Sequence, residues 1–154
     1  MPDFNIRVYE HKDFATVCQL DTLCFPPQIA YEPDEIRYFL AQRRAIRFVA
    51  ETERGVVAWI LGKVSLGQTA NSSTGHIVTV DVHPGFRRRG IGESLMNALE
   101  NEFRRHGCAR ARLEVAIDNL GAQAFYQRRE YKIVRTLRHY YADGSDAFRM
   151  ERAL

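Results

Sequence analysis

The clearest chemical signal in this sequence is a run of three arginines and two glycines, Arg87-Arg88-Arg89-Gly90-Ile91-Gly92. It follows an apolar stretch over residues 75–82 and precedes a helical pattern that begins at Ile91. The first turn of a helix carries unpaired N–H groups and the positive end of the helix dipole, so anions such as pyrophosphate bind there. Glycines let a ligand approach the backbone, and arginines suit phosphate. The run therefore predicts a pyrophosphate cradle.

The cradle differs from two common nucleotide-binding loops. It lacks the glycine spacing G-x-G-x-x-G of dinucleotide-binding proteins, and it lacks the Gly-Lys-Ser/Thr of a P-loop. On this loop alone, a solvated basic turn that caps an ordinary helix is an equally open interpretation, because short motifs give false matches.

Two downstream stretches, LEVAIDNLGAQAFY at 113–126 and RHYYADGSDA at 138–147, carry a family resemblance. Arg87, Gly90 and Gly92 resemble the Arg/Gln-x-x-Gly-x-Gly/Ala loop of the GNAT acyltransferases, which grips the pyrophosphate of acetyl-CoA. The first stretch resembles L-E-V-x-x-x-N-x-x-A-x-x-L-Y of that family. The second resembles the Y-Y-x-D-G-x-D-A hairpin of N-terminal amine acetyltransferases of the RimI type. The three patterns occur in the family's order and span half of the chain.

The resemblance implies an acetyl-CoA-dependent N-acetyltransferase that works by direct attack in a ternary complex. The implied acceptor is the N-terminal α-amine of a protein, of the ribosomal-protein-alanine type. The backbone of Val80, Asp81 and Val82 would pair with pantetheine and polarise the acetyl carbonyl. The full set of residues expected to bind acetyl-CoA is Val80, Asp81, Val82, Arg87, Arg88, Arg89, Gly90, Ile91, Gly92, Glu93, Asn119 and Tyr126.

Glu114 and Tyr126 are the candidate catalytic residues. Glu114 lies on a predicted strand, on the face opposite Leu113 and Val115. The resemblance makes it the base that deprotonates the amine through a water, whereas position alone favours an ion pair with a neighbouring arginine. An α-amine suits a carboxylate base because its reference pKa is about 7.7–8.0, against about 10.4 for lysine.

Tyr126 is the candidate acid for the departing thiolate. Adjacent helical residues point about 100° apart, so we expect one of Phe125 and Tyr126 to face the core and the other the cleft. The resemblance gives the cleft to Tyr126. Asn119 is expected to cap the helix that follows it and to hydrogen-bond the cofactor.

The acceptor site is expected among aromatic residues of two separate segments. In these acetyltransferases the segments that hold Phe25, Pro26 and Tyr31, and Tyr140 and Tyr141, flank the peptide groove. The alternative is that Phe25 and one of the two tyrosines belong to the core.

Two residues depart from the family pattern. Glu130 stands where a glycine usually ends the helix in a left-handed conformation, so we expect strain or a different helix end. Asp81 stands where a small or apolar residue is common, and it could add charge near the acceptor amine.

Hydrophobic periodicity predicts the element order β-α-α-β-β-β-α-β-α-β-β. Strands are expected at 5–9, 47–52, 56–63, 75–82, 112–117, 131–137 and 147–151, and helices at 11–23, 34–42, 91–106 and 120–129, with a polar loop over 65–74. This order indicates an α+β or mixed α/β fold around a mostly antiparallel sheet. The GNAT fold has this order, and its two central strands, here 75–82 and 111–117, splay apart to admit the pantetheine arm.

The bulk composition is that of one globular domain. A length of 154 residues fits a single GNAT domain over 1–154, and the chain is 45% hydrophobic and 27% charged. The net charge of +3 is too small to indicate nucleic acid. We expect a monomer or a weak homodimer without a membrane partner or a direct nucleic-acid partner.

The cysteines and the N-terminus indicate a cytoplasmic protein. Cys18, Cys24 and Cys108 are odd in number and lack metal-ligand spacing, which favours a reducing compartment and no metal site. The N-terminus has no signal-peptide pattern, and no apolar run approaches the length of a membrane span.

Three other functions are compatible with parts of the sequence. A GNAT enzyme could act on a small-molecule amine or a lysine side chain. A non-catalytic acyl-CoA-binding module is disfavoured because both Glu114 and Tyr126 are present. An arginine-rich RNA-associated protein is disfavoured by the small net charge and by the lack of an aromatic stacking pattern.

Overall fold

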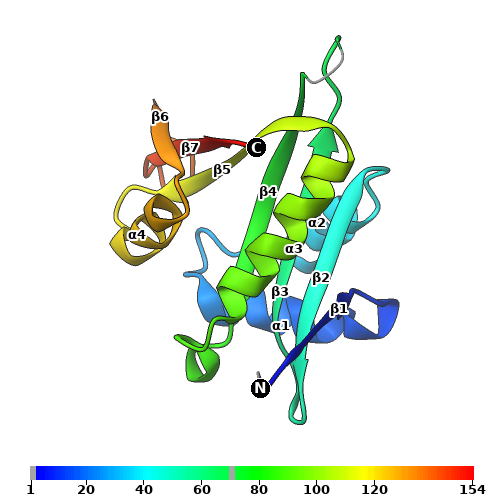
Figure 1. The fold of residues 1–154 in the computed structure, drawn as a ribbon. Coiled ribbons are helices and arrows are strands. Elements are labelled where there is room, and N and C mark those ends of the chain that lie inside the picture. Colours follow the sequence, from blue (N-terminus) through cyan, green and yellow to red (C-terminus); the bar gives the residue numbers. More distant parts are fainter. Residues whose placement is uncertain (1–2, 70–71) are drawn as a thin grey trace.

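The computed structural model describes residues 3–69 and 72–154 and has the predicted element order (Figure 1). The strands are β1 (Asn5–Val8), β2 (Ala45–Thr52), β3 (Gly55–Ser65), β4 (Ser73–Val82), β5 (Cys108–Ala116), β6 (Lys132–Leu137) and β7 (Ala147–Ala153). The helices are α1 (Phe14–Cys24), α2 (Pro33–Leu40), α3 (Ile91–Arg105) and α4 (Leu120–Arg128), with short 3-10 turns at His11–Asp13 and Pro84–Phe86.

The strands form one seven-stranded sheet in the order β1-β2-β3-β4-β5-β7-β6. Every neighbouring pair is antiparallel except β4 and β5, which run parallel. Helix α3 packs across β2–β5 on one face, while α1 packs on β3 and β4 and α2 on β2 from the other face. The predicted mixed α/β fold with a mostly antiparallel sheet is confirmed.

The two central strands separate after a short ladder. Pairing of β4 with β5 runs from Ser73↔Cys108 to His76↔Arg112 and then stops. Residues 77–82 of β4 and 113–116 of β5 therefore continue without pairing to each other, as expected for the splayed strands. The backbone edges that face one another there are free to bind a third, extended chain.

A β-bulge in β4 sets which side chains face which helix. Leu61 pairs with Thr79 and Gly62 with Ile77, so Val78 is the extra residue. Ile77 lies in the core beneath α3, whereas Thr79 bonds to Asp21 of α1 on the other face. A bulge of this kind changes the alternation of a strand by one residue, and it turns the end of β4 toward the site described below.

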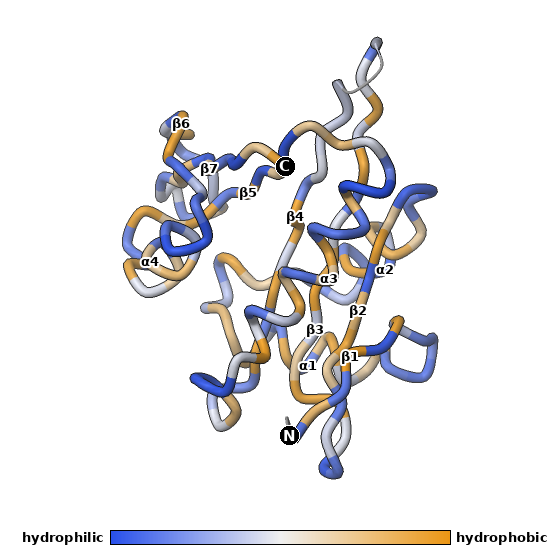
Figure 2. The backbone as a smooth tube through the Cα atoms, viewed as in Figure 1, coloured by the Kyte–Doolittle hydropathy of each residue, from blue (hydrophilic) through white to orange (hydrophobic). Residues whose placement is uncertain are grey.

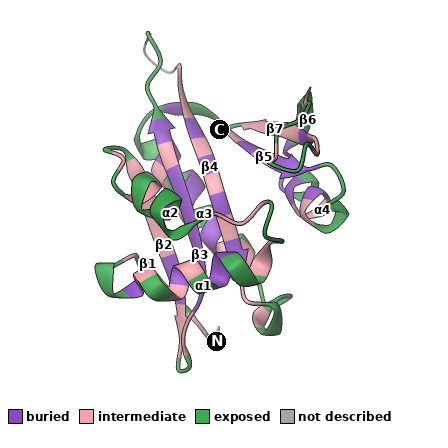
Figure 3. Ribbon diagram, turned by 180° about the vertical axis from the view of Figure 1, so that it is seen from behind, coloured by how far each residue is buried: buried purple, intermediate pink, exposed green. Residues whose placement is uncertain are grey.

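Two apolar clusters hold the layers together. The larger lies between α3 and the sheet and includes Leu95, Leu99 and Phe103, and the smaller lies under α1 and α2 around Trp59. Strands β3 and β4 carry hydrophobic segments in Figure 2, and in Figure 3 β3 is largely buried while β4 alternates between buried and intermediate residues. Gly75 allows this packing, because a Cβ there would lie 2.3 Å from the Phe103 ring.

Several predicted boundaries were wrong by a few residues. Strand β5 begins at Cys108 rather than at residue 112, and the first helix begins at Phe14 after a 3-10 turn. Strands β3 and β4 extend into the predicted loop over 65–74, of which residues 70–71 lie outside the described part of the chain. No helix within the described ranges is long and apolar enough to cross a membrane.

Candidate active site

The predicted cradle forms the N-terminus of α3. Gly90 is the N-cap residue with a φ of 80°, in the left-handed region that glycine favours. The first helical bond runs from the Ser94 N–H to the Gly90 carbonyl over 3.0 Å. The N–H groups of the residues between them therefore have no acceptor within the helix. A Cβ on Gly90 would meet nothing within 4 Å, so the space above this helix end is open.

The three cradle arginines are exposed beside this helix end. The Arg87 Nε donates to the Val82 carbonyl over 3.1 Å, which ties the cradle to the end of β4. Arg89 lies over the Phe86 ring, 5.0 Å from its centroid. Of the other predicted cofactor residues here, Ile91 is buried in the core, so it offers a ligand only its backbone.

Gly92 has a packing role that the sequence did not indicate. A Cβ on Gly92 would lie 3.4 Å from the Phe125 ring of α4. The absence of a side chain therefore lets α4 lie close to the start of α3. Asn119 caps α4 as predicted, because its side chain accepts the Ala122 N–H over 3.2 Å.

Glu114 lies on the sheet face opposite the α3 core and bonds to two residues. Its Oε1 is 2.7 Å from the His76 Nε2, and its Oε2 accepts the Arg149 Nε–H over 3.3 Å. The Glu114 side chain is only 9% exposed. The expected surface ion pair with Arg110 or Arg112 is therefore replaced by a nearly buried pair with His76 and Arg149. His76 comes from the last rung of the β4–β5 ladder.

The pKa of Glu114 reflects two opposing effects. Burial alone would raise it, but the His76 hydrogen bond and the charges of His76, Arg149 and Arg112 outweigh burial and lower the pKa below its ordinary value. Glu114 is therefore ionised at neutral pH and can only accept hydrogen bonds. The His76 Nε2 must then carry the hydrogen, and its Nδ1 is buried with no hydrogen-bond partner in the structure.

Three tyrosines are within electrostatic range of Glu114. Burial raises the pKa of Tyr31, Tyr140 and Tyr141, and the negative charge of Glu114 raises each of them further. The Tyr140 and Tyr141 rings meet edge to face with centroids 5.0 Å apart. The side chain of Glu114 contacts His76 and Arg149 rather than these rings.

The other predicted acceptor residues stand apart from this group. Phe25 is half-buried and Pro26 exposed, and neither joins the ring contacts or side-chain hydrogen bonds of the tyrosines in the described ranges. Phe25, Tyr140 and Tyr141 are all outside the buried clusters, so the alternative of plain core residues was wrong for each.

Tyr126 is more buried than the sequence indicated. Its surface is 9% exposed, and its ring lies in the α3 cluster, with its centroid 5.3 Å from that of Phe125. Phe125 packs against the same cluster, so the expected division of one ring to the core and one to the cleft is not seen. Burial raises the Tyr126 pKa above its ordinary value. The phenol therefore keeps its proton at neutral pH.

Asp81 adds no charge to the acceptor site. Its side chain is 1% exposed, and it accepts the Trp59 Nε1–H and the Thr79 hydroxyl, each over 2.7 Å. Burial, followed by the charge of the neighbouring Asp21, raises the Asp81 pKa well above its ordinary value. The idea that Asp81 places charge near the acceptor amine was wrong, because the bulge in β4 turns it under α1.

Asp21 and Asp81 form a pair of buried carboxyl groups. The Thr79 hydroxyl lies 2.7 Å from Asp81 and 3.4 Å from Asp21 but has a single hydrogen to donate. One of the two carboxyl groups must therefore carry a proton, because no cation is paired with either in the described residues and a buried unpaired charge is costly. The other Asp21 oxygen accepts the Tyr31 N–H over 2.7 Å and so holds the acceptor tyrosine.

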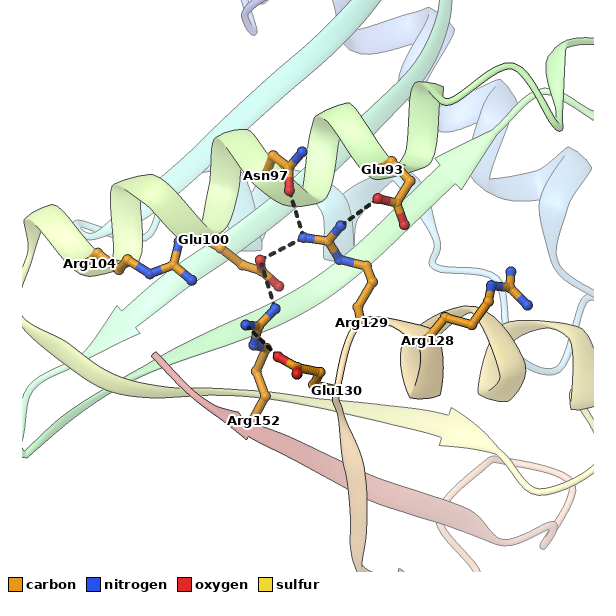
Figure 4. Close-up of a pocket in the computed structure, with 8 residues that line it drawn as sticks. All are labelled: Glu93, Asn97, Glu100, Arg104, Arg128, Arg129, Glu130 and Arg152. Carbon is orange, nitrogen blue, oxygen red and sulfur yellow. Dashed lines mark hydrogen bonds and ion pairs between the residues drawn. The ribbon is translucent and has the colours of Figure 1, made fainter.

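A polar cavity of about 360 Å³ lies between α3, the end of α4 and β7 (Figure 4). At its centre the buried Arg129 binds Glu100 over 2.6 Å and Glu93 over 2.9 Å. The Tyr131 hydroxyl donates to the second Glu100 oxygen over 2.7 Å. These bonds hold the end of α4 to α3, so the predicted cofactor residue Glu93 serves as a structural anchor through its side chain.

Sequence reasoning missed His76, Arg149 and Asp21. Each is a single polar residue whose partner lies far along the chain, 38 residues away for His76 and 35 for Arg149. No local pattern marks such residues. The only signal was strand alternation, which places His76 and Glu114 on the polar faces of their strands.

Comparison with known proteins is consistent with this geometry. The model of the acetyltransferase (GNAT) family matches residues 14–131. The chain is 30% identical to an N-alpha-acetyltransferase of Sulfurisphaera tokodaii over 96% of this chain and 92% of that protein. It is 34% identical to an uncharacterized N-acetyltransferase of Methanocaldococcus jannaschii over 94% of this chain and 88% of that protein.

Solved structures show the same architecture. The crystal structure of Ard1 from Thermoplasma volcanium superposes with a TM-score of 0.87 at 27% identity, covering 99% of this chain and 98% of that one. The ribosomal-protein-S18-alanine N-acetyltransferase of Escherichia coli gives a TM-score of 0.82 at 22% identity, covering 97% and 93%. At that identity the second likeness concerns the fold alone.

Proposed function

Because this chain belongs to the GNAT acetyltransferase family and is an acetyl-CoA-dependent N-acetyltransferase, we propose that it acetylates the α-amine at the N-terminus of a protein. The observation that carries this proposal is the Glu114–His76 pair at the point where β4 and β5 separate, with Tyr31, Tyr140 and Tyr141 within electrostatic range of Glu114. Aromatic walls suit an extended peptide end, and the Glu114 pair supplies a proton acceptor. Two curated relatives, 30% and 29% identical to this chain, are named N-alpha-acetyltransferases, which supports a protein N-terminus as the acceptor.

The residues present fit acetyl-CoA. The ladder between β4 and β5 ends at His76↔Arg112 and leaves backbone groups for an extended arm, and the open end of α3 with exposed Arg87, Arg88 and Arg89 suits a pyrophosphate. When bound, acetyl-CoA supplies an activated acetyl group as a thioester. The backbone of Val80–Val82 and the helix end at Gly90–Glu93 would hold it.

Glu114 and His76 manage the proton of the acceptor amine in this proposal. Glu114 alone, with its lowered pKa, is a weak base toward an α-ammonium group, whose reference pKa is about 7.7–8.0. The His76 Nε2, 2.7 Å from the Glu114 Oε1, fixes the orientation of the carboxylate, which accepts the proton as the amine attacks. The two residues therefore act as one unit.

Tyr126 acts as a hydrogen-bond donor to the departing sulfur in this proposal. A thiol has a reference pKa of about 8.5 and a phenol about 10, and burial widens the difference by raising the Tyr126 pKa. Complete proton transfer from Tyr126 to a thiolate is therefore uphill. A hydrogen bond to the developing negative charge still stabilises the transition state.

The experiment is acetyl-CoA turnover against short peptides, with mass spectrometry locating the acetyl group. The panel holds peptides with free and blocked N-termini, internal lysines, free amino acids and polyamines, and includes the alanine-led N-terminus of a ribosomal protein. Acetylation of the α-amine only when the N-terminus is free supports the proposal. Acetylation confined to lysines or small amines would contradict the proposal. The chain would then be an acetyltransferase for lysine side chains or small amines, an acceptor class that no feature of the described residues favours.

A ribosomal-protein acceptor is a prediction that the alanine-led peptide tests directly. We take residues 1–154 as one catalytic domain, and the three free cysteines accord with a cytoplasmic location.

A further inference from the structure

One face of the sheet beside Glu114 carries an excess of positive charge. The strand register places six basic side chains on it, and we call them the basic strip: Lys63, Arg110, Arg112, Lys132, Arg135 and Arg149. Lys63 lies opposite His76, which pairs with Arg112, and Arg112 in turn lies opposite Glu151 of β7. The opposite face of β3, β4 and β5 is apolar and packs beneath α3.

The outer part of this face is free of helices. Helices α1 and α2 lie over β2, β3 and β4, as Figure 3 shows, and the strands β6 and β7 extend beyond them. Arg110, Lys132 and Arg135 are exposed, while Arg112 and Arg149 are half-buried nearer the tyrosines. The strip therefore runs from the candidate active site to the surface.

The positive charges of the strip are poorly neutralised within the chain. Arg149 contacts Glu114, and Arg110 lies 3.9 Å from Glu151. Lys63, Arg112, Lys132 and Arg135 take part in no ion pair in the described ranges. The acidic residues that the register places beside these cations are Glu114 and Glu151, so the six cations of the strip outnumber the carboxylates there.

One local feature favours an anionic partner for the strip. Arg135 lies directly opposite Arg149 across β6 and β7, and like charges in that arrangement are destabilising without a counter-charge. An acidic side chain of a bound segment would supply that counter-charge.

The position of the strip relates it to the acceptor. Arg149 donates to Glu114 over 3.3 Å, and Arg112 pairs with His76 in the β4–β5 ladder, so both lie beside the groups that receive the amine. An extended chain rises about 3.3 Å per residue. The residues that follow the acceptor amine would therefore pass the cations of the strip within the first few positions.

We propose that the preferred acceptor is a polypeptide with acidic side chains in the positions just after its N-terminal residue, recognised by the basic strip. This inference rests on the proposed N-terminal acetylation. It concerns the selection of the acceptor rather than the chemistry, because only Arg149 among these cations bonds to Glu114.

The test compares peptides that share their first residue and differ at positions two to four, which hold glutamate, glutamine or lysine. We expect kcat/KM to be highest for glutamate and lowest for lysine, with about a tenfold difference between glutamate and glutamine at low salt. The difference should appear in KM and should shrink as ionic strength increases.

Variants assign the effect to the strip. The double variant Lys132→Gln/Arg135→Gln should lower the glutamate-to-glutamine ratio and leave turnover of the glutamine peptide unchanged. Arg54→Gln, an exposed arginine in the turn between β2 and β3, is the matched control and should leave the ratio unchanged.

The outcomes separate this inference from the proposed function. Equal kcat/KM for the three peptides, with the α-amine still acetylated, overturns the inference alone. Acetylation of no α-amine overturns both. If the peptides are equal and the double variant instead loses binding to a labelled single-stranded RNA, the strip serves a nucleic acid and the inference is wrong.

Discussion

At the scale of single residues, the site depends on how Glu114 is held. Its two oxygens are bonded to different strands, to His76 of β4 and Arg149 of β7. A carboxylate fixed on both sides has a defined orientation, and its lowered pKa keeps it charged through the neutral range. The role proposed for it is therefore that of an ionised proton acceptor whose position His76 and Arg149 fix.

We predict that Glu114→Gln lowers kcat by about 100-fold, the range typical of lost acid–base catalysis. The KM for acetyl-CoA should change little, because the cradle lies at the other end of the splayed strands. Steady-state kinetics on a free-N-terminus peptide would measure both. Glu151→Gln serves as the control, since Glu151 lies on the same sheet face opposite Arg112. An unchanged kcat in Glu114→Gln would remove Glu114 from the mechanism.

At the scale of elements, the end of α4 shows how the chain accommodates an unsuitable residue. The Tyr131 N–H bonds to the Tyr126 carbonyl and the Glu130 N–H to that of Gln127, the pattern of a Schellman motif. Glu130 occupies its left-handed position with a φ of 72°, as the sequence indicated. The helix end is thus retained at a cost in backbone strain.

We predict that Glu130→Gly stabilises the protein by about 0.5–1 kcal/mol, because glycine adopts a positive φ without the strain of a Cβ. The lost contact of Glu130 with Arg152 matters little, since the Glu130 side chain is 79% exposed. Urea unfolding would measure the change. Glu130→Ala removes the same contact but keeps the Cβ, so it should show no gain, and an equal gain in both variants would contradict the explanation by strain.

At the scale of the whole molecule, the pair of Asp21 and Asp81 makes stability depend on pH. Burial raises the pKa of both carboxyl groups above the ordinary value of 3.8, so the folded state holds a proton that the unfolded chain releases. A state that binds more protons loses stability as pH rises. The contribution of the pair is therefore most favourable below the ordinary carboxyl pKa and decreases as pH rises from there toward the raised pKa.

We predict that Asp81→Asn increases stability more at pH 8 than at pH 4, because an amide needs no bound proton: its oxygen can accept the Trp59 Nε1–H and its N–H can donate to the Thr79 hydroxyl oxygen. Thermal unfolding at the two pH values would measure the difference. Asp118→Asn, at an exposed position, should show no such dependence. An equal shift at both pH values for Asp81→Asn would show that the folded pair is already ionised.

The fold was predictable from the sequence to a greater extent than the site. Periodicity gave the order of the elements, and the strain at Glu130 followed from a single departure from a pattern. The bulge at Val78 was not predictable, because it depends on the register between two strands. The error about Asp81 followed from it. His76 was missed for a similar reason, since only folding brings it to Glu114.

The short ladder between β4 and β5 joins the two halves of the sheet at one end only, so it can act as a hinge. The ladder has four rungs, and His76 belongs to the last of them, where the strands begin to separate. When two strands open about a hinge, residues near the hinge move least and the far ends of the strands move most. The pair that handles the proton therefore lies near the pivot, where a change in the opening of the strands disturbs its 2.7 Å hydrogen bond least.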